Sequence, residues 1–206
     1  MNIEMWLAFT VASIVLLIIP GPTILTVISY SVSHGYRAKL PLIIAVALGD
    51  STALALSLLG LGTLLAESAF WFQMIKWAGG LYLLFLGVKL LRTGLRPAQI
   101  QQESEYASGW ILFLNTYLVT ALNPKGIIFF VAFLPQFINI SLNVTHQLWI
   151  LAMTFVALAT LNATLYAVFA GKARQVLASP KTQRIFNFTG GSLLSAAGIW
   201  ALSARQ

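Results

Sequence analysis

The sequence predicts an all-α integral membrane protein with six transmembrane helices, built as two inverted three-helix repeats. Composition is the first reason: 59% of the 206 residues are hydrophobic and only 8% are charged, with a mean hydropathy of +0.86. A soluble domain carries about 25% charged residues. Because a spanning helix needs about 20 apolar residues, the chain has room for six spans and short loops. We therefore predict one transmembrane domain over residues 1–206.

The second reason is a series of six apolar runs. They cover about residues 5–31, 41–66, 70–91, 110–137, 148–170 and 188–203. Pro41 suits the first turn of the second helix, where proline is favoured. Pro20-Gly21-Pro22 interrupts the first run and Asn123-Pro124 interrupts the fourth. Proline removes a helical hydrogen bond and disfavours helical geometry at the residue before it, so we expect the first and fourth helices to be broken there, with new helix starts at Pro22 and Pro124.

The third reason is an internal repeat. Three sets of residues match between the two halves. Gly79-Gly80 and Gly87 match Gly190-Gly191 and Gly198; Asp50 and Thr52 match Asn162 and Thr164; Pro20 and Pro22 match Pro124. An odd number of spans in each half inverts the second half, as in many secondary transporters. The predicted parts are repeat one at about 5–92, a polar cytoplasmic loop at about 93–109 and repeat two at about 110–204. Chance is the alternative, because glycine is common in membrane helices. We expect these glycines to let the third and sixth helices pack closely.

Basic residues indicate the orientation. Nine of the 12 lie in or beside the first, third and fifth loops: Arg37, Lys39, Lys89, Arg92, Arg96, Lys172, Arg174, Lys181 and Arg184. Only Lys76 and Arg205 fall on the other side. Lysine and arginine collect in cytoplasmic loops, so both termini are predicted outside the cytoplasm. The net charge of +7 is then a topology signal and does not indicate a nucleic-acid partner.

Lys125 is the most costly residue of the fourth run. A charged side chain at the bilayer centre costs roughly 2.5 to 3.5 kcal/mol on insertion scales, and such residues usually face a bundle interior or a water-filled path. The new helix starts after Gly21 and Asn123 would meet near the midplane, with free amides and positive dipole ends. We therefore predict a carboxylate site made by Pro20, Gly21, Pro22, Asn123, Pro124 and Lys125. In the alternative, the prolines only shape the packing and Lys125 reaches the interface.

Asp50 is the only carboxylate inside a predicted span. In a low-dielectric setting its protonated form is favoured unless a cation is near. We expect Asp50 to carry a proton or to bind a substrate ammonium, and the alternative is a structural ion pair with Lys125. Asn162, its repeat counterpart, offers neutral hydrogen bonding to a substrate or, alternatively, only between helices.

Several functional classes are disfavoured by what the spans contain. The chain has no cysteine and its two histidines lie outside the predicted spans, so no nucleophile with a base or thiolate metal site is predicted. We predict neither an enzyme nor a cofactor. A metal-ion exporter would need several hard or imidazole ligands and remains an alternative, as does a passive small-solute channel. The N-terminus has Glu4 and no basic residue before the first run, which is not typical of a cleaved signal peptide.

Motifs along the whole chain resemble the LysE/RhtB family of amino-acid exporters, which includes homoserine and threonine efflux proteins. The motifs are Ile19-Pro20-Gly21-Pro22, His34-Gly35-Tyr36-Arg37, Lys76-Trp77-Ala78-Gly79-Gly80-Leu81-Tyr82-Leu83 with Gly87, Asn123-Pro124-Lys125 and Leu134-Pro135-Gln136-Phe137.

This resemblance implies a multi-pass exporter in the bacterial inner membrane, driven by the proton gradient, with a six-helix inverted-repeat fold. Its implied partners are a small amino acid or close derivative, protons and the lipid bilayer. The family motif residues correspond to Pro20, Gly21, Pro22, Asn123, Pro124 and Lys125. The family varies at the position of Asp50, which leaves the proton carrier open. The substrate and the oligomeric state are also open, with a homo-oligomer among the alternatives.

Overall fold

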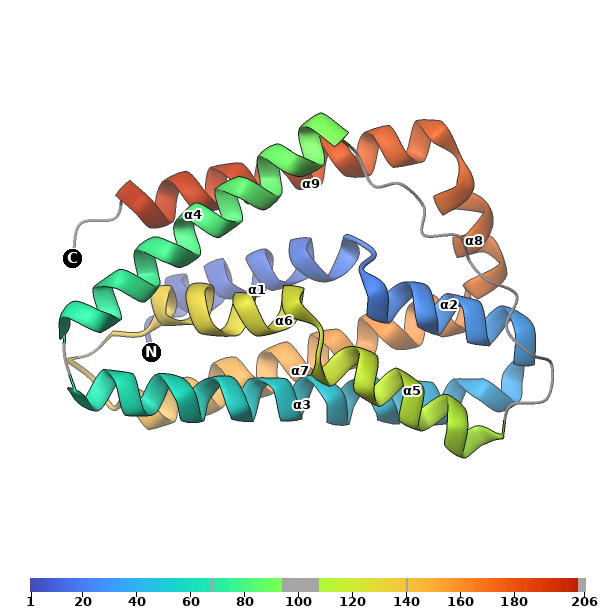
Figure 1. The fold of residues 1–206 in the computed structure, drawn as a ribbon, viewed down its shortest axis with the longest axis horizontal. Coiled ribbons are helices and arrows are strands. Elements are labelled where there is room, and N and C mark those ends of the chain that lie inside the picture. Colours follow the sequence, from blue (N-terminus) through green and yellow to red (C-terminus); the bar gives the residue numbers. More distant parts are fainter. Residues whose placement is uncertain (68, 94–107, 140, 204–206) are drawn as a thin grey trace.

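The computed structural model describes the whole chain except residues 68, 94–107, 140 and 204–206 (Figure 1). Within the described residues every regular element is helical. The α-helices are α1 (Ile3–Ile18), α2 (Pro22–His34), α3 (Tyr36–Glu67), α4 (Ala69–Thr93), α5 (Gly109–Ala121), α6 (Pro124–Ile128), α7 (Val144–Val168), α8 (Ala170–Ala178) and α9 (Pro180–Ser203). A π-helical turn (Phe129–Phe133) and a 3₁₀ turn (Leu134–Phe137) continue α6. The all-α prediction is confirmed.

Several of these helices are long and apolar enough to cross a membrane. In the described part of the chain they are Tyr36–Leu59, Gly109–Phe137 and Val144–Val168, and α1 with α2 makes a fourth if the bent pair counts as one span. The prediction of an integral membrane protein is confirmed, whereas the number of six spans stays a prediction. The predicted loop at 93–109 falls mostly on residues outside the described ones, as do Arg96 and Arg205.

Both predicted helix breaks are present. The axes of α1 and α2 differ by 52°, and α2 begins at Pro22 with Gly21 as its extended N-cap. The second break has Asn123 as N-cap, whose side chain accepts a hydrogen bond from the Lys125 amide at 3.1 Å, with Pro124 as the first helical residue. Asparagine at the N-cap and proline at the first position are both favoured, so local sequence accounts for both restarts.

The predicted start of the second helix at Pro41 is wrong. The helix α3 begins at Tyr36 and contains Pro41 in its second turn. Gly35 ends α2 with a φ of 64° and donates its amide to the Ser31 carbonyl at 3.1 Å. Glycine adopts this left-handed conformation at no steric cost, so the chain reverses in one residue and α3 starts at once. Pro41 then removes a single hydrogen bond near the helix start.

Two further helices begin earlier than predicted. Asn143 accepts a hydrogen bond from the His146 amide at 2.9 Å and starts α7 before the apolar run begins. The helix α9 begins at Pro180 and the short α8 precedes it. Capping residues determine where these helices start, and a hydropathy pattern does not identify capping residues.

Close packing of α4 against α9, the predicted third and sixth helices, is confirmed. A methyl group built on Gly87 would lie 2.5 Å from the Ser195 amide nitrogen, and one on Gly198 would lie 2.6 Å from the Leu84 amide nitrogen. Real side-chain carbons do not approach backbone this closely. Small residues at such a seam allow two membrane helices to touch along their backbones.

An aromatic cluster holds α1, the end of the broken fourth span and α7 together. The ring of Phe155 lies 4.7 Å from that of Phe130 and 5.5 Å from that of Phe129, and Phe9 lies 5.3 Å from Phe137. All of these side chains are at most 3% exposed. Tilted and edge-to-face ring pairs of this kind are favourable, and the two helix breaks lie beside the cluster.

Candidate functional site

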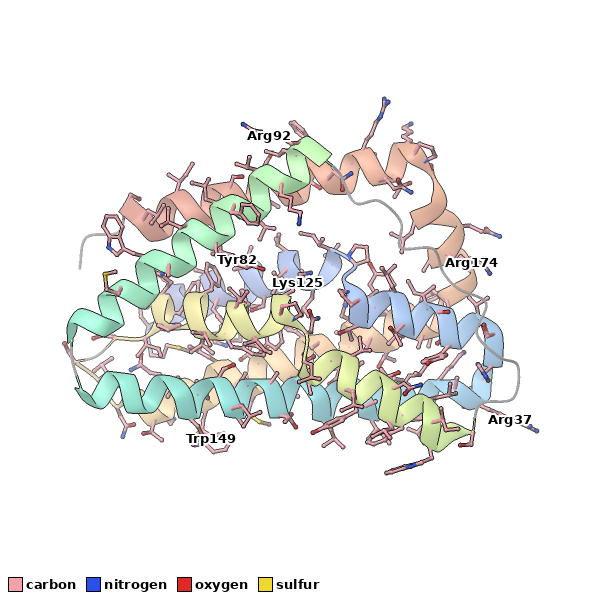
Figure 2. The ribbon with its side chains drawn as sticks, viewed as in Figure 1. Arg37, Tyr82, Arg92, Lys125, Trp149 and Arg174 are labelled. Atoms are coloured by element: carbon pink, nitrogen blue, oxygen red, sulfur yellow. The ribbon has the colours of Figure 1, made fainter. Side chains whose placement is uncertain are left out.

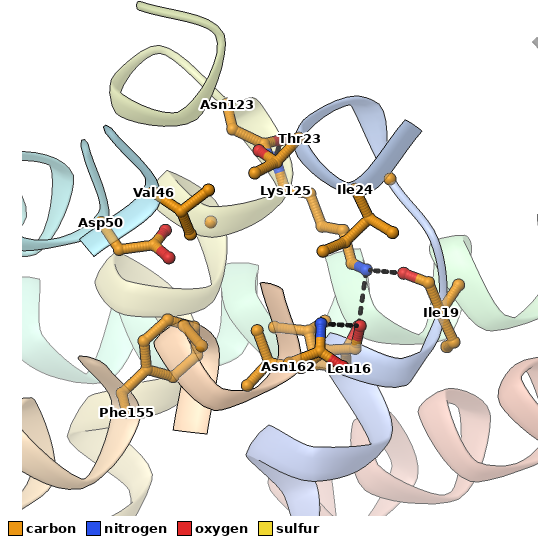
Figure 3. A pocket seen from close by; sticks show the side chains of 14 residues that line it. Leu16, Ile19, Thr23, Ile24, Val46, Asp50, Asn123, Lys125, Phe155 and Asn162 are labelled. Atoms are coloured by element: carbon orange, nitrogen blue, oxygen red, sulfur yellow. Dashed lines mark hydrogen bonds between the residues drawn. The ribbon is translucent and has the colours of Figure 1, made fainter. Parts of the chain in front are cut away.

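The two helix breaks lie side by side near the middle of the bundle (Figures 1 and 3). The Asn123 side chain donates a hydrogen bond to the Thr23 hydroxyl at 3.1 Å and so joins the two restarts. Lys125 passes close to Gly21, where a methyl group would lie 3.5 Å from the lysine Cδ. The expectation that the two restarts meet agrees with this arrangement.

A small cavity of about 50 Å³ lies between these breaks, α3 and α7. Its walls are formed by Leu16, Leu17, Ile19, Gly21, Thr23, Ile24, Val46, Asp50, Asn123, Lys125, Gly126, Phe155, Ala159 and Asn162. Gly21, Asp50, Asn123, Lys125 and Asn162 are the predicted site residues that line it. The three predicted prolines are not part of the wall, and they act by breaking the helices.

Lys125 crosses the break and binds the end of α1. Its ammonium donates hydrogen bonds to the carbonyl oxygens of Leu16 at 2.6 Å and Ile19 at 2.7 Å (Figure 3). The last carbonyls of a helix have no partner within it. In a continuous helix the amide of residue 20 would donate to the Leu16 carbonyl, but Pro20 has no N–H. The proline that breaks the helix therefore also leaves this carbonyl free to accept from the lysine. The positive charge lies at the negative end of the α1 dipole.

Two side chains of α7 satisfy the remaining carbonyls of α1. Asn162 donates to the Leu17 carbonyl at 3.1 Å, and Tyr166 donates to the Ile18 carbonyl at 3.0 Å. All four terminal carbonyls of the broken helix are thus paired with side chains from distant parts of the chain. Asn162 was among the predicted site residues and Tyr166 was missed. Tyr166 lies four residues after Asn162 and therefore on the same helix face, and this spacing is the sequence feature that could have indicated Tyr166.

Asp50 lies across the cavity from Lys125 (Figure 3). It is 9% exposed. Within the described residues no hydrogen bond or ion pair joins its carboxylate to another side chain, and the lysine ammonium is bound to carbonyl oxygens instead. The alternative of a direct ion pair with Lys125 is therefore not formed in this conformation. A carboxylate that faces a cavity without such a partner is available to a ligand.

The apolar side of the cavity was not predicted. Phe155 and Val46 are each 2% exposed and lie beside Asp50, and Ile24 lies beside the lysine stem (Figure 3). Apolar residues in an apolar span carry no distinguishing signal in the sequence. Among the described residues, no three His, Asp or Glu side chains lie together in a cluster that could hold a metal ion.

Tyr166→Phe is expected to reduce the free energy of unfolding by about 1 kcal/mol, because the Ile18 carbonyl at the end of α1 loses the tyrosine hydroxyl that donates to it while the ring volume is kept. Thermal unfolding of the purified protein measures the change. Tyr36→Phe is the matched control, since Tyr36 is 84% exposed and should have no effect. An equal loss in both variants would contradict the capping role of Tyr166.

Comparison with known proteins places these features in a family. Residues 14–204 match the family model described as LysE type translocator. The homoserine/homoserine lactone efflux protein of Salmonella typhimurium strain LT2 is 31% identical over 206 residues, which cover all of both chains. The protein of the same name from Salmonella typhi is also 31% identical over both full lengths.

An uncharacterized membrane protein of Vibrio cholerae is 31% identical over 205 residues, again over all of both chains. No solved structure matches the chain. The family model covers most of the sequence, including both helix breaks and the cavity between them. The chain therefore belongs to the LysE type translocator family and is a transporter of the amino-acid exporter type, not an enzyme.

Proposed function

We propose that the protein is a secondary active exporter of small amino acids or close derivatives, coupled to proton entry. The observation that carries this proposal is the cavity at the two helix breaks, with the Asp50 carboxylate and the Lys125 ammonium on opposite sides (Figure 3). A zwitterion presents the complementary pair of charges. The relatives named homoserine/homoserine lactone efflux proteins support a substrate of this size and type.

Lys125 can hold a carboxylate without leaving α1. An ammonium has three N–H donors, and Leu16 and Ile19 use two of them. The third donor is left for the substrate carboxylate, close to the amide-rich start of α2. The substrate ammonium then meets Asp50, whose oxygens have no partner among the described residues. Charge-assisted hydrogen bonds of this kind are about twice as strong as neutral ones.

The cavity size supports a closed state of a moving carrier. A volume of about 50 Å³ holds roughly three or four water molecules, whereas pockets for small-molecule ligands measure about 300–1,000 Å³. A substrate must therefore enter and leave through conformations in which the helices around the breaks separate. Alternate opening to the two sides of the membrane is the usual action of such carriers.

The proposed architecture has six spans in two inverted halves, about residues 5–92 and 110–204, separated by the polar cytoplasmic loop. In support, the matched elements run in opposite directions: α1 and α2 against α5 and α6, α3 against α7, and α4 against α9 (Figure 1). Glycines of the two halves also meet across the seam between α4 and α9, Gly87 against Gly191 and Gly198 against Gly80. We treat the whole as one transmembrane domain.

We place the protein in the bacterial inner membrane with both termini on the periplasmic side. The labelled side chains Arg37 and Arg174 lie toward the end of the bundle opposite the two chain termini (Figure 2). Basic side chains gather on the cytoplasmic side of a membrane protein. The short basic helix α8 lies at this same end.

Export is tested with purified protein in proteoliposomes. Counterflow of a panel of labelled amino acids, including homoserine, is expected to identify one or a few substrates. An imposed pH gradient should then drive accumulation against the substrate gradient, and an uncoupler should abolish it. Because one charge moved across 100 mV is worth about 2.3 kcal/mol, coupling to one proton sustains a gradient of roughly 50-fold. Flux that never exceeds equilibration would identify a passive channel and overturn the proposal.

Asp50→Asn is expected to separate exchange from coupling. The amide cannot release a proton, so accumulation driven by a pH gradient should be lost while counterflow persists at saturating substrate. The apparent affinity should fall about tenfold, because a charge-assisted hydrogen bond becomes a neutral one. Glu4→Gln, at the exposed start of α1, is the control and should behave as wild type. Gradient-driven accumulation that survives in Asp50→Asn would remove Asp50 as the proton carrier.

A further inference from the structure

We propose that the carbonyl end of α1 is a binding site for a primary ammonium cation, and that the side chain of Lys125 is its tethered resident ligand. The inference goes beyond the exporter function, because it concerns a cation site formed by the Leu16 and Ile19 carbonyl oxygens of α1. It predicts that the site persists when the lysine is shortened, and that a free alkylammonium of the right length then takes its place.

The geometry is that of a bound cation. The two distances from the lysine nitrogen to the Leu16 and Ile19 oxygens, 2.6 and 2.7 Å, are those of short, charge-assisted hydrogen bonds. The helix α1 has 16 residues, and its dipole adds negative potential at this end. In transporters with broken helices, C-terminal ends of half-helices coordinate coupling cations. Here the lysine ammonium stands where such a cation would be.

The site is built independently of the lysine. Asn162 and Tyr166 hold the two carbonyls between those of Leu16 and Ile19. Pro20 supplies no N–H to the Leu16 carbonyl, so the helix itself leaves that oxygen for a ligand. Two directed oxygens suit the N–H bonds of an ammonium, whereas hard divalent cations such as Ca²⁺ take six or more oxygens.

The path of the lysine stem defines the ligand. The stem arrives from α6 and passes Gly21 at van der Waals distance, with Ile24 beside it (Figure 3). Replacing Lys125 by alanine removes three carbons and the nitrogen, which together have the composition of propylammonium. The vacated space should accept propylammonium, with its alkyl chain against apolar residues and its nitrogen at the two oxygens.

The test uses purified full-length Lys125→Ala protein with propylammonium chloride as the probe. A saturable rise in melting temperature, about 3–6 °C at ten times the dissociation constant, is expected for this variant. Tetramethylammonium, a cation without N–H donors, should have no such effect. Wild type and Lys125→Met, whose side chains fill the space, should not respond to propylammonium. If the alanine variant is recovered as folded protein only when purified with propylammonium, that result also supports the site.

The proposal is overturned if propylammonium and tetramethylammonium act equally on Lys125→Ala, if wild type and Lys125→Met respond as the alanine variant does, or if the alanine variant is insensitive to propylammonium. The readout is binding to a variant, so it is separate from substrate counterflow by wild type. Failure of the cation site leaves the exporter proposal standing, and failure of counterflow leaves the cation site standing.

Discussion

Lys125→Met is expected to reduce counterflow at least about 100-fold and to lower the stability of the protein. The substitution keeps the apolar stem and removes the charge, so the Leu16 and Ile19 carbonyls lose their donor. Each buried acceptor left without a partner costs about 1–3 kcal/mol. Asp50 also loses the positive charge on the opposite side of the cavity. A loss of about 3 kcal/mol in substrate binding corresponds to the 100-fold change.

Counterflow in proteoliposomes and thermal unfolding in detergent measure the two effects. Lys172→Met is the matched control, because Lys172 is exposed on α8 outside the cavity and should retain wild-type transport. A Lys125→Met protein that exports as well as the control would show that neither the carboxylate nor the end of α1 needs this charge. A stable variant without transport would assign Lys125 to the substrate alone.

Gly198→Ala is expected to loosen the seam between α4 and α9 and to cost about 1–3 kcal/mol, the usual cost of overpacking. The added methyl group would meet the Leu84 amide nitrogen at 2.6 Å and the Gly80 carbonyl oxygen at 2.7 Å. Both contacts are backbone atoms, which cannot turn aside as a flexible side chain can. The helices must separate, and thermal unfolding records the loss.

Gly171→Ala is the matched control for this seam. A methyl group at Gly171 meets nothing within 4 Å, so this variant should be no less stable than wild type, and the higher helix propensity of alanine adds at most about 1 kcal/mol. Equal behaviour of the two alanine variants would mean that α4 and α9 do not keep this close contact in the membrane. A transport defect in Gly198→Ala with unchanged stability would instead indicate that the seam moves during the cycle.

The features that local chemistry controls were predictable. Pro22 and Pro124 end one helix and start the next whatever surrounds them, because the missing N–H and the fixed φ act within a few residues. The start of α3 was predicted five residues late, at Pro41, because the turn at Gly35 depends on a single backbone conformation. Hydropathy does not record that conformation.

The partner of Lys125 could not be predicted. The sequence led us to expect a lysine facing a ligand at two helix N-termini, whereas the ammonium binds the C-terminal carbonyls of α1, more than 100 residues away in the chain. Every residue has a backbone carbonyl, so the sequence does not show which carbonyls will bind a side chain. For the same reason Tyr166, which caps one of them, was missed.

The sequence by itself determined the class of this protein. Composition and the apolar runs predict membrane helices, the prolines locate two breaks, the glycines mark a close helix seam, and Asp50 and Lys125 stand out because burying a charge in an apolar span is costly. Only the tertiary structure decided where these two charges lie: the Lys125 ammonium is bound to the end of α1, and Asp50 faces the cavity with no hydrogen-bond partner among the described residues. The pairing depends on which helix end lies opposite which side chain, and packing of distant segments sets that distance.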